Sequence, residues 1–511
     1  SKQWFVRMQP LAEPALTVVK NGTVKIFPQR WVNLYNHWLE NVRDWCISRQ
    51  LWWGHRIPVY YCDHCHDPEK PEAKTGMIVS ETEPKRCPKC GSTKLRQDDD
   101  VLDTWFSSWL WPFGTLGWPE KTEDLERFYP TQTLVTGWDI IYLWVARMIM
   151  AGLEFTGSVP FSSVVFHPMV RDEKGRKMSK SLGNSPDPVE LADKYGADAM
   201  RLGIQLITPR EQDVLFSEKS LDVGRKFCNK LWNASRLIYM NHKDGSNELP
   251  TERSIYDEWI LSEFNELLEN INRYYETFEL NAIARALYDF VWHVFCDWFL
   301  EFDKLTASHS ARYLLKQIII MLHPYIPHIT EEIYQKFSFG KKSIMCETWP
   351  QKVALKQETD HVSLLKALIE QVRNVRGLFN ISAKDKLHAW LITPQKFQKF
   401  LESDTHIKVL KKLTGFDEIT FNTEPEIKVA SVILPNVQCY IELTGIDIQK
   451  EKTRLTREIA SLTKRIDEIK YRLNNPQYVT KASEMVKKRE AERLENFLKK
   501  KESISKAVEK L

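Results

Sequence analysis

The interpretation of this sequence begins from one pentapeptide, Lys177-Met178-Ser179-Lys180-Ser181, which continues into Leu182-Gly183-Asn184. Because it follows the polar, glycine-containing run 172–176, we expect it to form a loop. Two lysines on such a loop can surround a triphosphate and offset the charge that develops when the α-phosphate is attacked. Gly175 and Gly183 allow the loop to bend and close over a nucleotide. A bare Lys-x-x-Lys is more often a solvated basic loop, but the full pentapeptide favours nucleotide binding.

Two pairs of cysteines form the second motif. Cys62 and Cys65 make one Cys-x-x-Cys pair, and Cys87 and Cys90 make another, with 21 residues between the pairs. Four thiolates at this spacing can surround a metal ion tetrahedrally, as in a structural zinc ribbon. A closed site of this kind holds a fold together and leaves no position for substrate. We therefore predict structural Zn²⁺ at these cysteines, and we expect the histidines nearby to be bystanders.

Length and composition indicate a globular protein of several domains. The chain has 511 residues, of which 43% are hydrophobic and 27% charged, and one hydrophobic core rarely serves so many residues. No apolar stretch is long enough to cross a membrane, and 1–5 resembles no targeting peptide. Nine cysteines are too few for a disulfide framework in a chain of this length. We expect a cytoplasmic protein with no membrane partner.

The C-terminal segment is basic and carries heptad repeats. From Ile446 to Leu511 there are 18 lysines and arginines against 11 acidic residues, whereas the whole chain has a net charge of +4. Apolar residues recur every seven positions, or every four and three in alternation, on either side of Asn474-Asn475-Pro476. This pattern predicts an antiparallel coiled-coil hairpin. Its charge favours contact with a polyanion such as nucleic acid, and an assembly hairpin is the alternative.

Changes in pattern along the chain predict a multidomain protein with α/β and all-α parts. Apolar runs alternate with amphipathic stretches before about residue 217, as in α/β architecture, and long helical periods follow. The expected segments are 1–44 as a junction of strands and a helix, 45–100 as a zinc-ribbon-like segment, 101–217 as an α/β segment with the lysine-containing loop, 218–346 as a helix bundle, 347–445 as a small α/β domain, and 446–511 as the coiled coil.

At this point the sequence resembles a known family. The pentapeptide is the second signature of class I aminoacyl-tRNA synthetases, which have a Rossmann-type catalytic domain. The resemblance implies that 101–217 forms the second half of that domain. Other stretches resemble the valyl-tRNA synthetases in particular, and the likeness runs from end to end of the chain. These stretches are 45–58, Asp103-Thr104-Trp105-Phe106-Ser107-Ser108, 137–149, 229–234, 323–332 and the terminal coiled coil.

The resemblance implies roles for the ATP-binding residues. Lys177 and Lys180 would hold the phosphates and act as the catalytic residues, with Lys180 the stronger candidate. Met178, Ser179 and Ser181 would shape the same ATP-binding loop. A second element implied by the family meets the adenosine, through Gly137 and Asp139.

The resemblance also implies a valine pocket walled by Trp105 and Ile140. A flat indole and a branched aliphatic side chain suit a small apolar ligand. Without the family, an isolated tryptophan or isoleucine would be assigned to the core. The substrates implied are L-valine, ATP with Mg²⁺, and tRNA(Val), with 218–346 as the anticodon-binding domain.

One signature of the family is absent from the printed residues. Class I synthetases carry a His-x-Gly-His motif on the first half of the nucleotide fold, and this sequence has none. We expect the chain to begin just after the family's editing domain and, by itself, to lack ligase activity. The expected function is a piece of a monomeric valine–tRNA ligase. The alternatives are a non-catalytic tRNA-binding module and a fragment of isoleucyl type.

Overall fold

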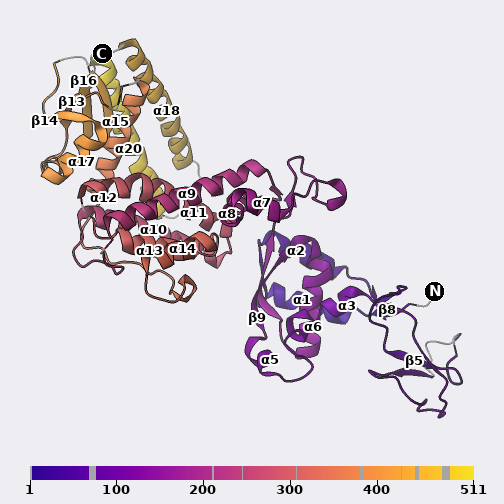
Figure 1. The fold of residues 1–511 in the computed structure, drawn as a ribbon. Coiled ribbons are helices and arrows are strands. Elements are labelled where there is room, and N and C mark those ends of the chain that lie inside the picture. Colours follow the sequence, from indigo (N-terminus) through magenta and orange to yellow (C-terminus); the bar gives the residue numbers. More distant parts are fainter. Residues whose placement is uncertain are drawn as a thin grey trace. The chain divides into compact units, whose positions relative to one another are not determined.

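The computed structural model describes residues 3–67, 69, 76–209, 212–243, 245–306, 308–379, 381–382, 384–426, 429–442, 448–474 and 484–510. The chain folds as two compact units, each of which is described separately below (Figure 1). None of the described helices combines the length and apolarity that a membrane crossing requires. The first unit comprises Ser1–Leu191, Gly203–Leu221 and Arg273–Asn281, and the second comprises Ala192–Leu202, Asp222–Asn272 and Ala282–Leu511.

A parallel three-stranded sheet lies at the centre of the first unit. Its strand order is β2 (Lys25–Phe27), β10 (Phe161–His167) and β9 (Thr131–Gly137). Val164 of β10 stands beside Ile26 of β2 in the register, and both side chains are buried. This face is buried because three helices pack into one apolar core with it (Figure 1). They are α1 (Gln9–Lys20), α2 (Arg30–Glu40) and α6 (Ala146–Thr156).

The opposite face and one edge of this sheet are more open. Val165 of β10 stands beside Phe27 and Val135 in the register, and Val135 is 58% exposed. All three residues line a cavity of about 1090 Å³. Among the described residues, β9 pairs with β10 alone. The sheet therefore ends at an open edge strand.

The chain leaves β9 through an irregular helical segment. A 3₁₀ turn, η2 (Trp138–Ile140), leads into a π-helix, η3 (Ile141–Val145), which continues as α6. The apolar run Ile140–Ile149 predicts a buried helix here. A helix is present from Ile141 and is buried from Val145 to Ile149, but Leu143 is 38% exposed and the first turn is wound more widely than an α-helix. Such π segments are often found at functional sites.

The remaining elements of the first unit are short, apart from two helices at its boundary. The small sheets pair β1 (Phe5–Val6) with β3 (Trp45–Cys46), β4 (Ser48–Arg49) with β8 (Val101–Leu102), β11 (Val170–Arg171) with β12 (Val214–Leu215), and β5 (Val59–Cys62) with β6 (Met77–Val79) and β7 (Leu95–Gln97). The short helices are α3 (Thr104–Ser108), α4 (Trp111–Gly114), α5 (Glu123–Phe128) and η4 (Lys180–Leu182). Two longer helices, α7 (Pro188–Tyr195) and α8 (Ala197–Ile207), each contribute residues to both units, as do three of the helices given next.

Helices dominate the first part of the second unit. The spacing of Phe227, Leu231, Ser235 and Ile238 predicts one helical face, and this is confirmed, since all four side chains are buried on one helix, α9 (Glu218–Asn241). Pro324 and Pro327 predict a break in the helical stretch from Ile318 to Ile333, and this is confirmed, because one helix ends at Leu322 and the next begins at Pro327. The other helices are α10 (Ile255–Glu276), α11 (Leu280–Asp289), η5 (Phe290–Phe299), α12 (Leu300–Thr306), α13 (Ala311–Leu322), α14 (Pro327–Phe337) and η6 (Ile344–Cys346).

One helical face differs from the periodicity. The helical spacing of Leu287, Phe290, Val294 and Trp298 predicts one shared face, and three of these side chains are buried. Val294 is only half-buried, and Phe295 is fully buried instead. The cause is that η5 is a π-helix, whose turns contain more residues than those of an α-helix.

A mixed α/β part follows in the second unit. Its four-stranded sheet has the order β14 (Phe416–Phe421), β13 (Leu387–Ile392), β16 (Val437–Glu442) and β15 (Val429–Leu434). Sequence patterns indicate three of these strands and miss β14. The helices here are α15 (Asp360–Leu378), α16 (Gln395–Leu401) and α17 (Asp404–Thr414).

Two long antiparallel helices complete the described part of the second unit, α18 (Ile448–Asn474) and α20 (Glu484–Lys510) (Figure 1). Their direction follows from two ion pairs between them, Arg472–Glu490 at 3.6 Å and Lys500–Glu458 at 3.0 Å. Their apolar seam packs against β15 through Ile433, Leu455, Leu462 and Ile504. The turn expected at Asn475-Pro476 lies outside the described residues, and the segment boundaries expected from the sequence stay predictions.

Candidate functional site

The carboxyl end of β9 carries the first group of predicted ATP-binding residues. β9 ends at Gly137, which stands beside His167 at the end of β10. A Cβ on Gly137 would lie 2.7 Å from the Asp139 carboxylate oxygen Oδ1, so a larger residue would displace that side chain. In open parallel sheets, ligands bind beyond the carboxyl ends of the strands. Gly137 and Asp139 therefore stand where a nucleotide can be expected.

The loop that carries Lys177 and Lys180 also lies near the carboxyl end of β9. Nζ of Lys177 lies 3.8 Å from Oδ2 of Asp139, and the two side chains are 71% and 37% exposed. An ion pair this exposed adds little to stability. Its significance is geometric, because it brings a candidate phosphate-binding cation and a candidate ribose-binding carboxylate together from separate parts of the chain.

Two polar side chains that the sequence analysis did not single out organise this loop. Asn184 Oδ1 accepts the Ser179 backbone N–H at 2.9 Å, and Asn184 Nδ2 donates to Asp172 at 2.9 Å and to the Lys177 carbonyl at 3.3 Å. Asp172 also accepts the Arg176 backbone N–H at 2.8 Å and pairs with the Arg176 guanidinium. The loop therefore has an internal hydrogen-bond frame around its lysines. The sequence feature that could have indicated this frame is Asn184, which directly follows Gly183.

The frame also explains the acidity of Asp172. The hydrogen bond from Asn184, with those from Arg176, lowers the pKa of Asp172 to about 2. The carboxylate therefore stays ionised at any physiological pH and keeps its role as acceptor. Further along the loop, the Ser179 and Ser181 hydroxyls lie 3.1 Å apart, and Met178 is half-buried. The Lys180 backbone begins η4, but its side chain lies outside the described part of the structure.

The two candidate valine-pocket residues lie on neighbouring elements. Trp105 is on α3 and Ile140 is the last residue of η2, and both are half-buried. Trp144 Nε1 donates to the Ser108 carbonyl at 2.8 Å, which ties the π-helix η3 to α3. The sequence analysis did not foresee this contact, because Trp144 and Ser108 lie 36 residues apart.

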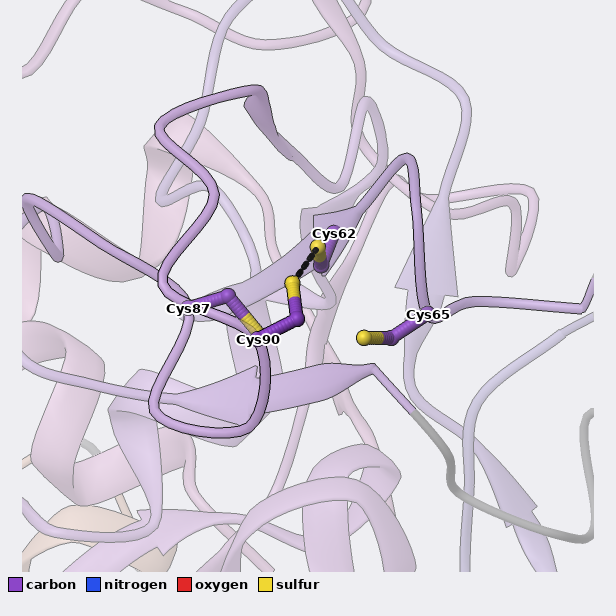
Figure 2. A group of neighbouring side chains, drawn as sticks. All are labelled: Cys62, Cys65, Cys87 and Cys90. Atoms are coloured by element: carbon purple, nitrogen blue, oxygen red, sulfur yellow. Dashed lines mark hydrogen bonds between the residues drawn. The ribbon is translucent and has the colours of Figure 1, made fainter.

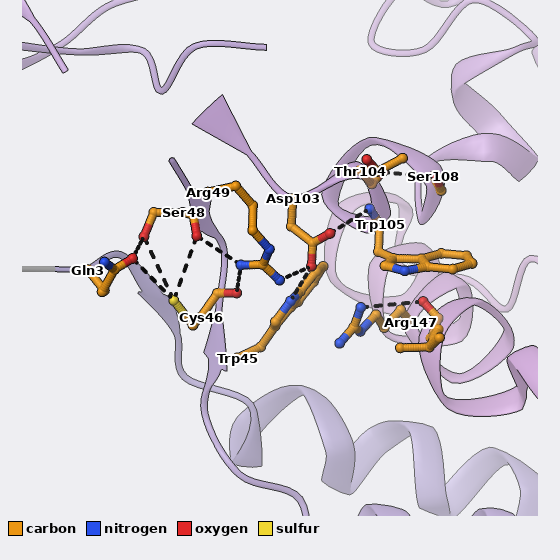
Figure 3. A network of polar contacts seen from close by, with 11 residues as sticks. Gln3, Trp45, Cys46, Ser48, Arg49, Asp103, Thr104, Trp105, Ser108 and Arg147 are labelled. Atoms are coloured by element: carbon orange, nitrogen blue, oxygen red, sulfur yellow. Dashed lines mark hydrogen bonds and ion pairs between the residues drawn. The ribbon is translucent and has the colours of Figure 1, made fainter. Parts of the chain in front are cut away.

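A buried carboxylate lies behind Trp105 (Figure 3). Oδ2 of Asp103 accepts the Trp45 indole N–H at 2.9 Å and the Arg49 guanidinium at 2.8 Å. Its Oδ1 accepts the Trp105 backbone N–H at 3.3 Å and so caps α3. The guanidinium of Arg147 lies 3.6 Å from the centre of the Trp45 ring. Burial lowers the pKa of Arg147 to about 10, which leaves it charged at neutral pH.

The four predicted metal ligands meet at one point (Figure 2). The Sγ atoms of Cys62, Cys65, Cys87 and Cys90 all lie within 4.8 Å of one another, and those of Cys62 and Cys90 are 3.6 Å apart. Tetrahedral Zn–S bonds of about 2.3 Å would separate the sulfurs by about 3.8 Å. Four thiols in this arrangement fit a metal ion with only small adjustments. No histidine belongs to the cluster among the described residues.

Gly76 allows the backbone around Cys62 and Cys65 to adopt this arrangement. Gly76 has a φ of +73°, and a Cβ there would lie 2.5 Å from the His66 backbone nitrogen and 2.9 Å from the Cys65 Cβ. Its carbonyl accepts the Cys62 N–H at 2.8 Å. Both the backbone conformation and the close approach therefore require glycine at this position.

Three known families match successive parts of the chain, in the order of domains that the sequence predicts. A family described as tRNA synthetases class I (I, L, M and V) matches residues 1–217. The anticodon-binding domain of tRNA ligase matches 257–391, and the valyl tRNA synthetase tRNA binding arm matches 447–511. A LeuRS–tRNA–LeuAMS ternary complex from Agrobacterium radiobacter K84 has a TM-score of 0.51 at 18% identity over 80% of this chain and 54% of that one. This likeness supports the fold alone.

Sequence relatives give a closer match. The chain is 42% identical to the valine–tRNA ligase of Thermotoga maritima over 508 residues, covering 97% of this chain and 57% of that protein. It is 41% identical to the valine–tRNA ligase of Carboxydothermus hydrogenoformans, covering 99% of this chain and 59% of that protein. The chain thus spans less than two thirds of the length of these relatives. It belongs to the valyl-tRNA synthetase family of class I aminoacyl-tRNA synthetases.

Proposed function

We propose that the protein carrying this chain is a valine–tRNA ligase. A valine carboxylate oxygen attacks the α-phosphorus of ATP, a P–O bond forms, and pyrophosphate leaves. A terminal hydroxyl of tRNA(Val) then attacks the valyl carbonyl, and AMP leaves. The observation that carries the proposal is the approach of Lys177 to Asp139 at 3.8 Å, beyond the carboxyl end of β9.

The chain's residues would take distinct roles in the first step. Asp139 accepts hydrogen bonds from the ribose hydroxyls, and Gly137 lets the nucleotide approach the backbone. Lys177 and Lys180 stabilise the negative charge on the phosphates of the Mg²⁺–ATP complex as pyrophosphate departs. When ATP binds, Lys177 exchanges the solvent-exposed Asp139 carboxylate for phosphate oxygens. The loop frame around Asp172 and Asn184 keeps the lysines within reach.

The test is valine-dependent ATP–pyrophosphate exchange by the full-length protein that contains this chain. Replacing one charge-stabilising group at such a site costs about 10²–10³-fold in kcat, so we expect that loss for Lys177→Ala and Lys180→Ala. Lys174→Ala is the matched control, because Lys174 is an exposed lysine of the same loop that makes no ion pair among the described residues. Equal losses in all three variants would contradict the proposed roles. Isoleucine-dependent exchange that exceeds the valine rate would replace the valine assignment with the isoleucyl one.

We also propose that Cys62, Cys65, Cys87 and Cys90 hold Zn²⁺. The support is the mutual approach of four thiols within 4.8 Å. The ion would act structurally, because four protein ligands leave no open position. Metal analysis of the purified chain should give about one zinc per chain, and Cys62→Ser should abolish binding. Cys346→Ser is the control, since Cys346 lies outside the cluster. Full zinc retention by Cys62→Ser would contradict the assignment.

Binding of tRNA is the second activity we propose for this chain. It is favoured by the basic α18–α20 pair, proposed here to be a coiled coil, and by the family matches over the bundle and the arm. Purified chain should bind tRNA(Val) more tightly than a non-cognate tRNA across a salt series. Equal, salt-sensitive binding of both would leave only non-specific attraction. We further propose that the protein acts as a monomer in the cytoplasm.

A further inference from the structure

The region behind the candidate valine pocket contains a charged network that the proposed reaction does not use. Asp103 is 7% exposed, and its carboxylate receives three hydrogen bonds (Figure 3). They come from the Trp45 indole at 2.9 Å, the Arg49 guanidinium at 2.8 Å and the Trp105 backbone at 3.3 Å. A buried carboxylate with its acceptor oxygens filled by donors from separate segments fixes those segments relative to one another.

We propose that Asp103 is a positioning residue that sets Trp105 in the amino-acid pocket. This inference rests on the proposed function, because it assumes that Trp105 contacts valine. Asp103 does not itself touch the substrate. It caps α3, a helix of only five residues, and its hydrogen bonds tie the start of that helix to β3 and β4.

Three contacts explain why the carboxylate can hold this helix so firmly. The Asp103 N–H donates to the Ile47 carbonyl at 2.7 Å, so the backbone before α3 is fixed as well as the side chain. Arg49 also donates to the Cys46 and Ser48 carbonyls, each at 2.8 Å, which prevents its guanidinium from swinging away. Short α-helices have little stability of their own, and α3 depends on these contacts for its direction.

Arg147 adds the electrostatic reason for a carboxylate at this position. Arg147 is 7% exposed, stacks on Trp45 at 3.6 Å, and has an Nε without a hydrogen-bond partner. The positive charges of Arg49 and Arg147 repel each other, and a nearby anion offsets that repulsion. Asp103 supplies that anion, and a neutral residue of the same shape would not.

Asparagine at position 103 cannot reproduce this arrangement. Its amide nitrogen would have to face either the Trp45 and Arg49 donors or the Trp105 N–H, and in each orientation a donor meets a donor. We therefore expect Asp103→Asn to release Trp105 from its fixed position. Loss of one charge-assisted hydrogen bond corresponds to about a tenfold or larger rise in the KM for valine.

The chain offers a close control in Asp98. It is also buried, at 9% exposure, and it accepts the Trp4 indole N–H at 2.9 Å, the Tyr61 hydroxyl at 2.6 Å and the Asp100 backbone N–H at 2.9 Å. The chemistry is the same, including a backbone N–H two residues further on, but none of these partners belongs to α3. Asp98→Asn should loosen its own surroundings and leave Trp105 in place.

The first experiment uses this chain labelled with 5-fluorotryptophan and observed by ¹⁹F NMR. The Trp105 resonance is assigned from its loss in Trp105→Phe. We expect Asp103→Asn to shift or broaden the Trp105 resonance and Asp98→Asn to leave it unchanged. An unchanged Trp105 resonance in Asp103→Asn, or an equal change in both variants, would overturn the proposal. If Asp103→Asn does not fold, Arg49→Gln removes one partner at a side chain that is 40% exposed, and the same shift is expected.

The second experiment measures ATP–pyrophosphate exchange by the full-length protein. Asp103→Asn should raise the KM for valine about tenfold and leave the KM for ATP within about twofold, whereas Asp98→Asn should leave both near wild type. Equal rises in both KM values would indicate a general structural role and overturn the proposal. Absence of valine-dependent exchange in the wild type would refute the proposed function instead, and the ¹⁹F result would still decide whether Asp103 positions Trp105.

Discussion

Asn184 shows how a single side chain can arrange a loop through its hydrogen bonds. Its amide accepts from Ser179 and donates to Asp172 and the Lys177 carbonyl. Alanine would remove all of these bonds and leave the backbone of the loop to water. The lysines would remain present but would be held less closely.

We therefore predict that Asn184→Ala accelerates tryptic cleavage within 174–180 of the purified chain by about tenfold. This factor corresponds to a decrease of about one to two kcal/mol in the free energy of local opening. The comparison is Asn21→Ala, since Asn21 Oδ1 accepts the Thr23 N–H in an exposed turn outside this loop. Mass spectrometry of early digests gives the cleavage rates. Identical rates in wild type and Asn184→Ala would show that the frame adds nothing to loop order.

Titration of one histidine gives a second prediction for a single residue. His242 Nε2 lies 2.8 Å from Oδ2 of the buried Asp303, and that hydrogen bond raises the pKa of His242 above its ordinary value of about 6.5. Because the folded state holds the proton more tightly, the stabilisation is complete below about pH 6.5 and is lost as the pH rises through the raised pKa. Urea unfolding should show this loss in wild type.

The variant His242→Gln should lose this part of the pH dependence. His323 is the contrasting case, because burial lowers its pKa, and protonating it destabilises the fold as the pH falls. His323→Gln should therefore keep the loss of stability at high pH that His242→Gln removes. A flat profile in wild type between about pH 6 and 9 would contradict the assignment.

At the scale of elements, the basic helix pair allows a prediction about phosphate contacts. Lys464 and Arg465 are exposed on α18 and form no ion pair with a described carboxylate, whereas Lys499 on α20 pairs with Glu495 at 2.8 Å. Unpaired cations are free to replace the counterions of a polyanion. We expect Lys464→Gln with Arg465→Gln to weaken tRNA binding by the chain and to reduce the salt slope by about 2.

The matched variant is Lys499→Gln, whose charge is already neutralised by its neighbour. It should change the salt slope by less than about 0.5. Fluorescence anisotropy with labelled tRNA(Val) across a salt series gives both slopes. Equal slopes for the two variants would mean that this face of α18 does not meet the phosphates.

The elements also show how far the sequence could predict the fold. Apolar spacing located α9 because its buried residues follow the ordinary helical period. On η5 it misassigned one residue of the face, Val294, because periodicity analysis assumes α-helical winding and η5 is a π-helix. It missed β14, whose Asp417 and Glu418 are exposed on an edge strand and interrupt the alternation.

For the candidate site, local motifs were more informative than distant contacts. The cysteine spacing predicted a cluster that the structure brings together. The network around Asp103 could not be foreseen, since Trp45 and Arg49 lie 58 and 54 residues away in the sequence. Such contacts depend on tertiary packing, which no local pattern encodes. The roles of Lys177, Asp139, Trp105 and Ile140 stay predictions until the variants are measured.

For the whole molecule, the division into two compact units predicts how the chain unfolds. Each unit has its own buried core, so a single cooperative transition is not expected. All four cysteines of the proposed zinc site belong to the first unit. Scanning calorimetry should show two transitions, and chelation of the metal should lower only one of them, by about 5–10 °C.

Cys62→Ser should reproduce the chelated profile, and chelator should then have no further effect. Cys346→Ser, in the second unit, should retain the response to chelator. A chelator-induced shift of both transitions by the same amount would show that the two units unfold as one.

The open edge at β9 has a consequence for isotope exchange. β10 has a hydrogen-bonded neighbour on both sides, so its amide protons should be among the slowest in the first unit to exchange with deuterium. In β9 every second N–H points away from β10 and has no strand partner among the described residues, so fast and slow positions should alternate along 131–135, before the buried end of the strand. Any segment that adds a strand at this edge would slow the exchange of the amides that point away from β10. It would leave the exchange of the amides bonded to β10 unchanged. The alternate amides of β9 are thus a residue-by-residue reporter of whether the sheet has been extended.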